Sequence, residues 1–255
     1  MNLIITASTD KGLEREKNQD SLLAKQYRIE GHHVVAAIIS DGMGGEVKGE
    51  IASSSVVKSF ERWIANFQFL SGKTRPEIDC GSVGKDGWTT SMGKLNAYGK
   101  KRDAIVGVTA AVLLIIDDLY FVLNVGDSRI YQITSRQIKQ ITEDQTITAL
   151  AVRRGDMTEE EAMNDDRQGI LAQAVGMQST CLQDLYAGRI TGTTSFLMCT
   201  DGFRNKLSLK DIGYALNPEH FTDKNQMKAL LRKLTYLCRE RGETDNISAL
   251  LIKAY

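Results

Sequence analysis

Proline is scarce in this sequence, with two residues in 255, and no low-complexity stretch divides the chain. Because nothing marks a linker, we expect a single domain that spans residues 1–255. The four cysteines lie far apart and form no CxxC pair, which argues against structural zinc and against a disulfide framework. Cys199 and Cys238 stand in apolar surroundings and are expected in the core. Unpaired cysteines of this kind are typical of a reducing cytoplasm, which is the expected location.

An excess of charge of one sign and long apolar runs are also missing. The 32 basic and 32 acidic side chains cancel, so no basic surplus favours a nucleic-acid backbone as a partner. No apolar run reaches the roughly 18 residues that a membrane helix needs. The first residues carry no secretion signal. We therefore expect no nucleic-acid partner and no membrane association.

Short apolar runs, most of them rich in β-branched residues, predict strands. They cover residues 34–40, 110–116, 120–125, 129–133, 196–199 and 247–253. Asp117 and Asp118 predict a hairpin turn between two of these runs. Ser135 and Arg136 predict a turn from residues 129–133 into residues 137–141. Because the strands follow one another closely, the pattern favours antiparallel sheets over βαβ units.

Helical patterns occupy other parts of the chain. Residues 49–67 carry apolar side chains at close to a 3.6-residue period, and residues 225–241 place theirs on one face. Thr158, followed three residues later by Glu161, predicts a capping box that opens a short helix. Residues 69–86 contain Ser, Gly, Lys, Pro and Asp and predict a surface loop. This order of strands and helices indicates an α+β fold.

Four aspartates stand beside predicted strands. Asp41, Asp127 and Asp201 follow a strand, and Asp245 precedes the last one. An unpaired carboxylate is costly at the end of a sheet core, so the repeated placement indicates that these side chains converge on cations. Oxygen ligands without nearby His or Cys suit Mg²⁺ or Mn²⁺. The alternative is that each aspartate belongs to an ordinary turn, which turn statistics favour by about two to one for any single site.

Eight segments form a series that runs nearly from end to end of the chain. They are STDKGLEREKNQDS (8–21), ISDGMGGEVKGEIAS (39–53), GVTAAVLLI (107–115), LNVGDSRIYQI (123–133), ITEDQT (141–146), VRRGDMTEEEAMNDDRQGILAQAVG (152–176), MCTDGFRNKLS (198–208) and ETDNISALLI (243–252). In this order they resemble the metal-dependent protein phosphatases, the type 2C serine/threonine phosphatases, and their bacterial members in particular. Any one segment alone is a weak signal, whereas the series is specific.

The resemblance implies a fold, an activity and partners. The fold is a four-layer α-β-β-α sandwich, with two antiparallel sheets packed face to face and helices outside. The activity is hydrolysis of phosphoserine and phosphothreonine in proteins by a hydroxide that bridges two Mn²⁺ or Mg²⁺ ions, with a possible weaker third ion. The partners are phosphorylated proteins, including a serine/threonine kinase and its targets, and the enzyme is expected to be a monomer that acts in signalling.

The resemblance also implies which residues hold the metal ions. Asp41, Asp201 and Asp245 match the metal-ligating aspartates of the family, and they are the expected catalytic residues together with Arg15. Gly42 matches the glycine whose backbone carbonyl binds one ion. The metal-ligating residues among them come from three segments of the chain that are far apart in sequence.

Three further residues match supporting positions of the family. Asp127, in GDSR, matches the residue that helps to hold the third ion. Asp20, in NQD, matches a carboxylate that supports metal-bound waters. Arg15 matches the arginine that binds the substrate phosphate, a role that suits the planar, two-pronged guanidinium.

The sequence departs from the family pattern at several positions. Gln19 stands where animal relatives have a metal-binding Glu, so Asp20 is expected to act through water. Met43 stands where those relatives place a His proposed as the general acid, and the three histidines of this chain match no catalytic motif. Gln145 replaces a frequent His, and Asn205 replaces a frequent Asp. The two-metal core is therefore expected to be intact, and the affinity for a third ion to be lowered.

Residues 144–170 resemble the flap that lies beside the active site in this family. The stretch RRGDMTEEEAMNDDRQ mixes charges of both signs, so it is read either as a solvated helix and loop or as a mobile cover that shapes substrate choice. Two other functions stay open at this point. One is a phosphoprotein-binding module that has lost catalysis, and the other is a metal-dependent phosphatase of a small phosphorylated metabolite.

Overall fold

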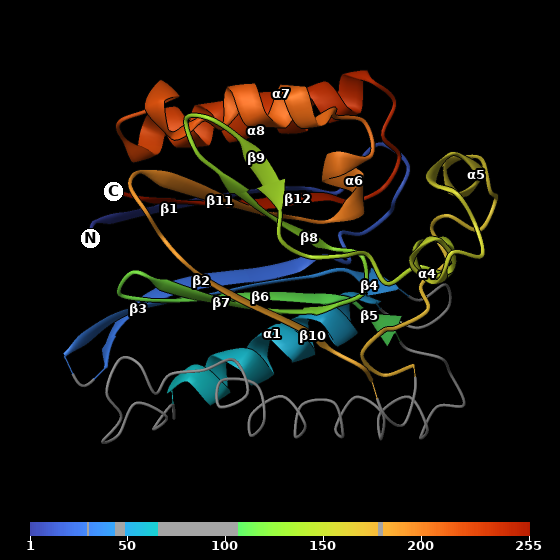
Figure 1. Ribbon diagram of the computed structural model, residues 1–255, viewed down its shortest axis with the longest axis horizontal. Helices are drawn as coiled ribbons and strands as arrows, with labels where there is room; N and C mark the ends of the chain where they lie inside the picture. Colours follow the sequence, from blue (N-terminus) through green and yellow to red (C-terminus); the bar gives the residue numbers. More distant parts are fainter. Residues whose placement is uncertain (30, 44–48, 66–106, 178–180) are drawn as a thin grey trace.

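A computed structural model describes residues 1–29, 31–43, 49–65, 107–177 and 181–255 of the protein. The described residues form two five-stranded sheets that lie one above the other (Figure 1). The loop expected at residues 69–86 lies outside the described residues.

Both five-stranded sheets are antiparallel throughout. The first has the strand order β1 (Leu3–Asp10), β12 (Ile247–Ala254), β11 (Thr194–Cys199), β8 (Arg129–Ile133) and β9 (Ile138–Gln140). The second has the order β10 (Asp184–Arg189), β7 (Leu119–Val125), β6 (Ala110–Ile116), β3 (His32–Ser40) and β2 (Ser21–Ile29). A short antiparallel pair joins β4 (Gly42–Met43) to β5 (Gly107–Val108).

Strand β3 shows why the apolar runs of the sequence are continuous. Its odd-numbered residues from Val35 to Ile39 pack in the core between the two sheets. Its even-numbered residues from Val34 to Ile38 pack against the outer layer that contains helix α1 (Gly49–Ala65). Successive side chains point to opposite faces of a strand. Because both faces of β3 are covered, both sets of side chains are apolar, and the usual alternation of apolar and polar residues is absent.

Helices cover the outer face of each sheet. Phe60 of α1 belongs to the core layer outside the second sheet. Ile212 of α7 (Leu209–Ala215) and Leu231 of α8 (Lys224–Glu240) belong to the layer outside the first sheet. Figure 1 shows α7 and α8 on one side of the paired sheets and α1 on the other. The expected four-layer sandwich is confirmed. Among the described residues, no helix combines the length and the apolar character needed to cross a bilayer.

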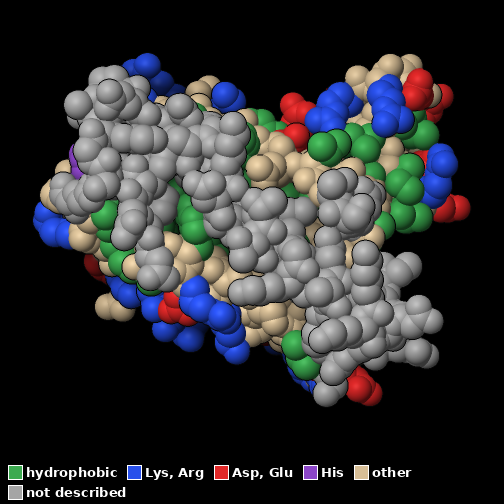
Figure 2. Space-filling model, turned by 90° about the horizontal axis from the view of Figure 1, so that it is seen from below, with side chains coloured by type: hydrophobic (Ala, Val, Ile, Leu, Met, Phe, Trp, Pro, Cys, Tyr) green, Lys and Arg blue, Asp and Glu red, His purple; other side chains and the backbone are tan. Residues whose placement is uncertain are grey.

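Two short helices project from one end of the sandwich. They are α4 (Ile147–Arg154) and α5 (Glu159–Met163), at the right of Figure 1. The predicted capping box is present, because the Thr158 hydroxyl accepts from the backbone N–H of Glu161 at 3.2 Å and the Glu161 carboxylate accepts from the N–H of Thr158 at 2.7 Å. In Figure 2 basic, acidic and hydrophobic side chains lie close together on the lobe at this end.

The strands expected from apolar runs are all present, and other elements are additional. Asp117 and Asp118 form the hairpin turn between β6 and β7, with Asp117 at φ 53°. Strands β1, β2 and β10 were not expected. In β10 the residues alternate between half-buried and exposed, and few of the side chains are large and apolar. The short helices α4, α6 (Asp201–Arg204) and α7 were not expected either.

Helix ends differ slightly from the expected ones. Helix α8 begins at Lys224, because the side chain of Asp223 accepts from the N–H groups of Asn225 and Gln226 and caps the helix. Helix α1 is described up to Ala65, and residues 66 and 67 of the expected helix lie outside the described residues.

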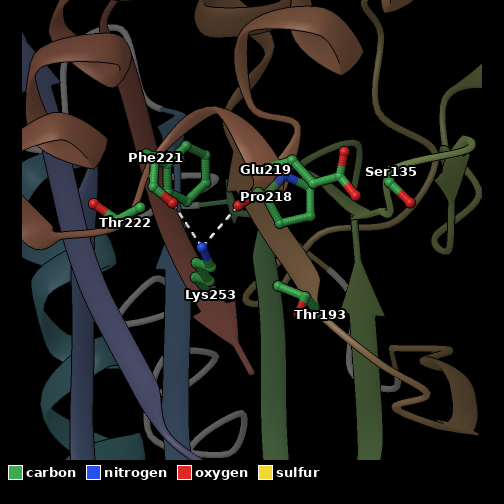
Figure 3. Close-up of a pocket in the computed structure, with 7 residues that line it drawn as sticks. All are labelled: Ser135, Thr193, Pro218, Glu219, Phe221, Thr222 and Lys253. Atoms are coloured by element: carbon green, nitrogen blue, oxygen red, sulfur yellow. Dashed lines mark hydrogen bonds between the residues drawn. The ribbon is translucent and has the colours of Figure 1, made fainter.

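A buried lysine ties helix α8 to the first sheet. Lys253 on β12 is 7% exposed, and its ammonium group donates to the carbonyls of Pro218 at 2.7 Å and of Phe221 at 2.6 Å (Figure 3). The ammonium also lies 5.0 Å from the centre of the Phe221 ring. Both carbonyls belong to the segment that leads into α8. The lysine therefore fixes this segment against β12, beside a pocket of about 400 Å³.

The substitution Lys253→Met tests this attachment. Methionine preserves most of the apolar stem but leaves two carbonyls without their charged donor, so the free energy of unfolding should fall by about 1–3 kcal/mol. Urea denaturation measures the change. Lys228→Met, at an exposed position of α8, is the matched control and should change stability by less than about 0.5 kcal/mol. An equal loss in both variants would contradict the assigned role of Lys253.

Candidate metal centre

The strand ends bring the predicted carboxylates to one end of the sandwich. Strands β11 and β12 are antiparallel, with Cys199 opposite Ala249, so the residues that follow β11 lie next to those that precede β12. Asp201 and Asp245 are thereby neighbours. In Figure 1, α6, β4 and β5 lie at this same end, beside α4.

Asp41 lies among several other carboxylates. Burial raises its pKa well above the usual value, and the nearby negative charges of Asp20, Asp201, Asp127 and Asp245 raise it further. Charges shift a pKa in this way only when they are close together. The structure therefore brings together the five aspartates that the resemblance assigns to the site.

Asp201 begins helix α6 and contacts Asp41. Burial raises the pKa of Asp201, whereas the positive charge of Arg204 and hydrogen bonds from the Gly202 backbone and from Asp41 lower it. The N–H of Gly202 donates to Oδ1 of Asp201 at 2.7 Å. A hydrogen bond between two carboxyl groups requires that one of them keeps a proton, which is how two like charges are accommodated at close range.

Asp20 lies close to Asp41 and Asp201, and one of its carboxylate oxygens lacks a hydrogen bond among the described residues. Burial raises its pKa to about 7, although hydrogen bonds from Ser248 and Thr200 oppose the rise. The Thr200 hydroxyl donates to Oδ2 at 3.1 Å. Its other oxygen, Oδ1, is buried and has no hydrogen-bond partner among the described residues. An unpaired buried oxygen is costly, and it is a suitable acceptor for a water molecule of a metal ion.

Arg15 forms a two-pronged ion pair with Asp245 at the rim. Its Nε donates to Oδ1 of Asp245 at 2.9 Å and its Nη2 donates to Oδ2 at 2.7 Å. The arginine side chain is 52% exposed. The charges of Asp245, Asp41 and Asp201 all raise the pKa of its guanidinium. Arg15 is thus a cation that faces both the carboxylates and the solvent.

Asp127 is the most enclosed member of the group and is paired with an arginine. Burial raises its pKa to about 7, and the charge of Asp201 adds to the rise, whereas the charge of Arg204 opposes it. Nη2 of Arg204 donates to Oδ2 of Asp127 at 3.2 Å. The sequence analysis did not find Arg204, since an arginine in a surface-like TDGFRNK stretch carries no signal of a buried ion pair.

Asn246 holds the N-terminal loop of the site and was also missed. Its amide Nδ2 donates to the backbone carbonyls of Lys11 at 2.8 Å and Lys17 at 3.0 Å. Its Oδ1 accepts from the N–H of Gln19 at 2.7 Å. These three bonds fix the loop that carries Arg15 against the start of β12.

Thr109 and Gln145 position two other parts of the site. The Thr109 hydroxyl accepts from the N–H of Asp41 at 2.9 Å, and the N–H of Thr109 donates to the carbonyl of Asp41 at 2.9 Å. Oε1 of Gln145 accepts from the N–H of Gly126 at 2.9 Å, directly before Asp127. From the sequence, Gln145 was noted only as a departure from the family pattern. Its hydrogen bond with Gly126, 19 residues earlier in the chain, could not be predicted from the local sequence.

Gly42 lies where the backbone of three segments meets. A side chain there would collide with the carbonyl of Gly49 and would come within 2.8 Å of the carbonyl of Gln19. This close approach accounts for glycine at position 42, next to Asp41. The residues that follow Met43 in this segment, 44–48, lie outside the described residues.

The donor set fits a hard divalent cation by its chemistry. The carboxylates around Asp41 are oxygen ligands, and their combined negative charge is what closely spaced divalent cations require. Oδ1 of Asp20 adds an acceptor that lacks a partner among the described residues. No three side chains of the described residues are already arranged around one point as ligands. Asp245 and Asp127 are instead engaged by Arg15 and Arg204.

The described histidines make their contacts elsewhere in the fold, and Cys199 and Cys238 are core residues, as expected. His32 pairs with Asp117 in the turn between β6 and β7 at 2.7 Å, and His220 contacts the carbonyl of Tyr214 at 2.7 Å. Cys199 and Cys238 are both fully buried in the outer core layer of the first sheet. Burial raises the pKa of the Cys199 thiol to about 12, which makes it inert as a nucleophile.

Comparisons with known proteins found similar chains among bacterial phosphatases. The serine/threonine phosphatase stp of Listeria welshimeri is 25% identical over 251 residues, which cover 96% of this chain and 93% of the relative. The crystal structure of the serine/threonine phosphatase Stp1 from Staphylococcus aureus matches with a TM-score of 0.84 and 24% identity, over 100% of this chain and 96% of that one.

A further solved structure contains metal. The catalytic domain of the serine/threonine phosphatase PstP, in complex with two manganese ions, matches with a TM-score of 0.77 and 23% identity, over 98% of this chain and 97% of that one. The profile of the protein phosphatase 2C family matches residues 13–251. The family, the enzyme class and the sandwich fold expected from the sequence are therefore confirmed, and the chain belongs to the protein phosphatase 2C family.

Proposed function

We propose that the protein hydrolyses phosphoserine and phosphothreonine in other proteins and thereby opposes a serine/threonine kinase. The observation that carries this proposal is the gathering of Asp41, Asp201 and Asp245 at one end of the sandwich, with Arg15 at its rim. The names of the relatives support the same substrate class.

Asp41, Asp201 and Asp245 would hold two Mn²⁺ or Mg²⁺ ions, with the carbonyl of Gly42 as a further ligand and Asp20 acting through water. Bound ions of this kind would lower the pKa of a water molecule and stabilise the negative charge on the phosphoryl oxygens during attack. The chain itself supplies the negative charge that keeps the ions in place. It also supplies the closely packed glycine backbone at Gly42 that lets the loop approach them.

Arg15 would bind the phosphate group of the substrate. Its guanidinium already makes two parallel hydrogen bonds to a carboxylate, and a phosphate presents a similar pair of oxygens. Because Arg15 is half exposed, a phosphate can reach it from solvent.

The segment that contains α4 and α5 would cover the substrate. A pocket of about 470 Å³ lies between this segment and the site. Its lining includes Met163 of α5 and Thr148 of α4 together with Asp201 and Asp127 of the centre. A phosphopeptide bound at the centre would therefore contact α4 and α5.

The variant Asp201→Asn tests the role of the carboxylates. Removal of one ligand charge should lower kcat/KM on a phosphothreonine peptide with Mn²⁺ more than about 100-fold, which exceeds the range for residues that only support metal ligands. Glu240→Gln, an exposed carboxylate of α8, is the matched control and should leave kcat/KM unchanged. Asp41→Asn should behave as Asp201→Asn does, and unchanged turnover in either variant contradicts the proposal.

The variant Arg15→Ala separates phosphate binding from metal binding. The loss of a charged, two-pronged hydrogen bond should lower kcat/KM about 10- to 100-fold. Calorimetry should show Mn²⁺ bound at least as tightly as in the wild type, since Arg15 supplies no ligand and its removal frees both oxygens of Asp245. Arg232→Ala, at an exposed position of α8, is the control. If Arg15→Ala loses Mn²⁺ instead, the arginine maintains the centre and does not bind phosphate.

Metal binding should release protons. Burial raises the pKa of Asp20 to about 7 and that of Asp41 well above its usual value, so these carboxyls hold protons in the metal-free protein as pH falls. Bound cations favour the ionised form. The apparent Mn²⁺ affinity should therefore fall as pH is lowered through about 7. Calorimetric titration in two buffers with different ionisation enthalpies measures the released protons, and equal heats in both buffers would contradict the prediction.

A further inference from the structure

Arg204 is a buried cation that the reaction proposed above does not use. It stands three residues after Asp201 on helix α6 and its side chain is 14% exposed. Arginine is rarely buried without paired negative charge. Its contacts therefore indicate what it neutralises.

The guanidinium of Arg204 is shared between two carboxylates. Its Nη2 lies 3.2 Å from Oδ2 of Asp127, 3.4 Å from the backbone carbonyl of Asp127 and 3.4 Å from Oδ2 of Asp144. Its Nη1 donates to the side-chain oxygen of Asn205 at 3.2 Å. Asp127 thus receives side-chain and backbone contacts from the same nitrogen.

Asp144 already has its own arginine. Nε of Arg129 donates to Oδ1 of Asp144 at 2.8 Å and Nη2 of Arg129 donates to Oδ2 at 2.7 Å. Since Arg129 satisfies Asp144, the charge of Arg204 is available for Asp127. Arg129, Arg204, Asp127 and Asp144 then form a group of zero net charge next to the other carboxylates of the centre.

This charge balance is unfavourable for a metal ion at Asp127. A divalent cation bound to Asp127 would stand within a few ångströms of the Arg204 guanidinium, and two positive charges repel at that distance in a partly buried site. The ion would also have to displace the guanidinium from Oδ2. Among the described residues, neither Asp41 nor Asp201 shares a hydrogen bond with Arg204, whose charge reaches Asp201 only through space. Asp245 pairs with Arg15, which is half exposed and can move away into solvent.

We propose that Arg204 is the built-in counter-ion of Asp127 and excludes a metal ion from it, so that the centre binds two ions and not three. This inference rests on the proposed function, because it concerns the ion count of the same centre. It replaces the expectation that Asp127 helps to hold a third ion. Asp127 then acts by fixing Arg204 and helix α6, which carries Asp201.

Mn²⁺ counting by equilibrium dialysis and calorimetry tests the inference in four proteins: the wild type, Asp127→Asn, Arg204→Met and the double variant. We expect two ions in the wild type and two in Asp127→Asn. Arg204→Met should bind a third, weaker ion, and the double variant should return to two, which assigns the extra ion to Asp127. Arg204→Lys retains the positive charge and should stay at two.

Several results overturn the inference. A wild type that binds three ions, together with an Asp127→Asn variant that binds two, shows that Arg204 does not exclude the third. Arg204→Met with two ions does the same, provided that circular dichroism shows a folded protein. Arg153→Met, which removes an exposed arginine of α4, is the control and should keep two ions. A wild type that binds no Mn²⁺ contradicts the proposed function itself and is thereby distinguished from failure of this inference alone.

Discussion

The repulsion among carboxylates at one end of the sandwich is the constraint on which the rest of the structure depends. Asp20, Asp41, Asp127, Asp201 and Asp245 are at least half-buried. Burial, together with the charges of neighbouring carboxylates, raises the pKa values of Asp20, Asp41, Asp127 and Asp201. A fold would not bring such groups together for stability, since unpaired charge away from water is costly. The two sheets and their covering helices supply the stability that allows this end to carry the charges.

Two arginines contact these carboxylates, one at the solvent-exposed rim and one in the interior. Arg15 lies at the solvent side and contacts Asp245, whereas Arg204 lies inside and contacts Asp127. The outer arginine can leave its carboxylate for a phosphate at little cost, because surface ion pairs contribute little free energy. The inner one is held by Asp127 and Asp144 together. Under the proposed function, the same side-chain type would therefore serve as a substrate ligand in one place and as a fixed charge in the other.

Much of the fold and of the site could be predicted from the sequence. The inner strands were clear because helices and the opposite sheet cover both of their faces, which leaves continuous apolar runs such as β3. β10 was missed because its residues alternate between half-buried and exposed. Asp41, Asp127, Asp201 and Asp245 were singled out because each stands beside such a run, whereas Asp20 came only from the family resemblance. Arg204 and Asn246 were not found, because their partners are 77 and up to 235 residues away, and nothing in the local sequence records a distant partner.

Pairing of the first and last strands has a consequence for how the molecule acquires its active form. Strand β1 pairs with β12 along its whole length, and Asn246 ties the loop after β1 to the start of β12. Contacts between residues so far apart in sequence form slowly during folding, because a long loop must close first. During synthesis, the loop that carries Arg15 cannot reach its final position until residues 246–254 have left the ribosome. The nascent chain should therefore have no working centre, however much of its second sheet has already formed.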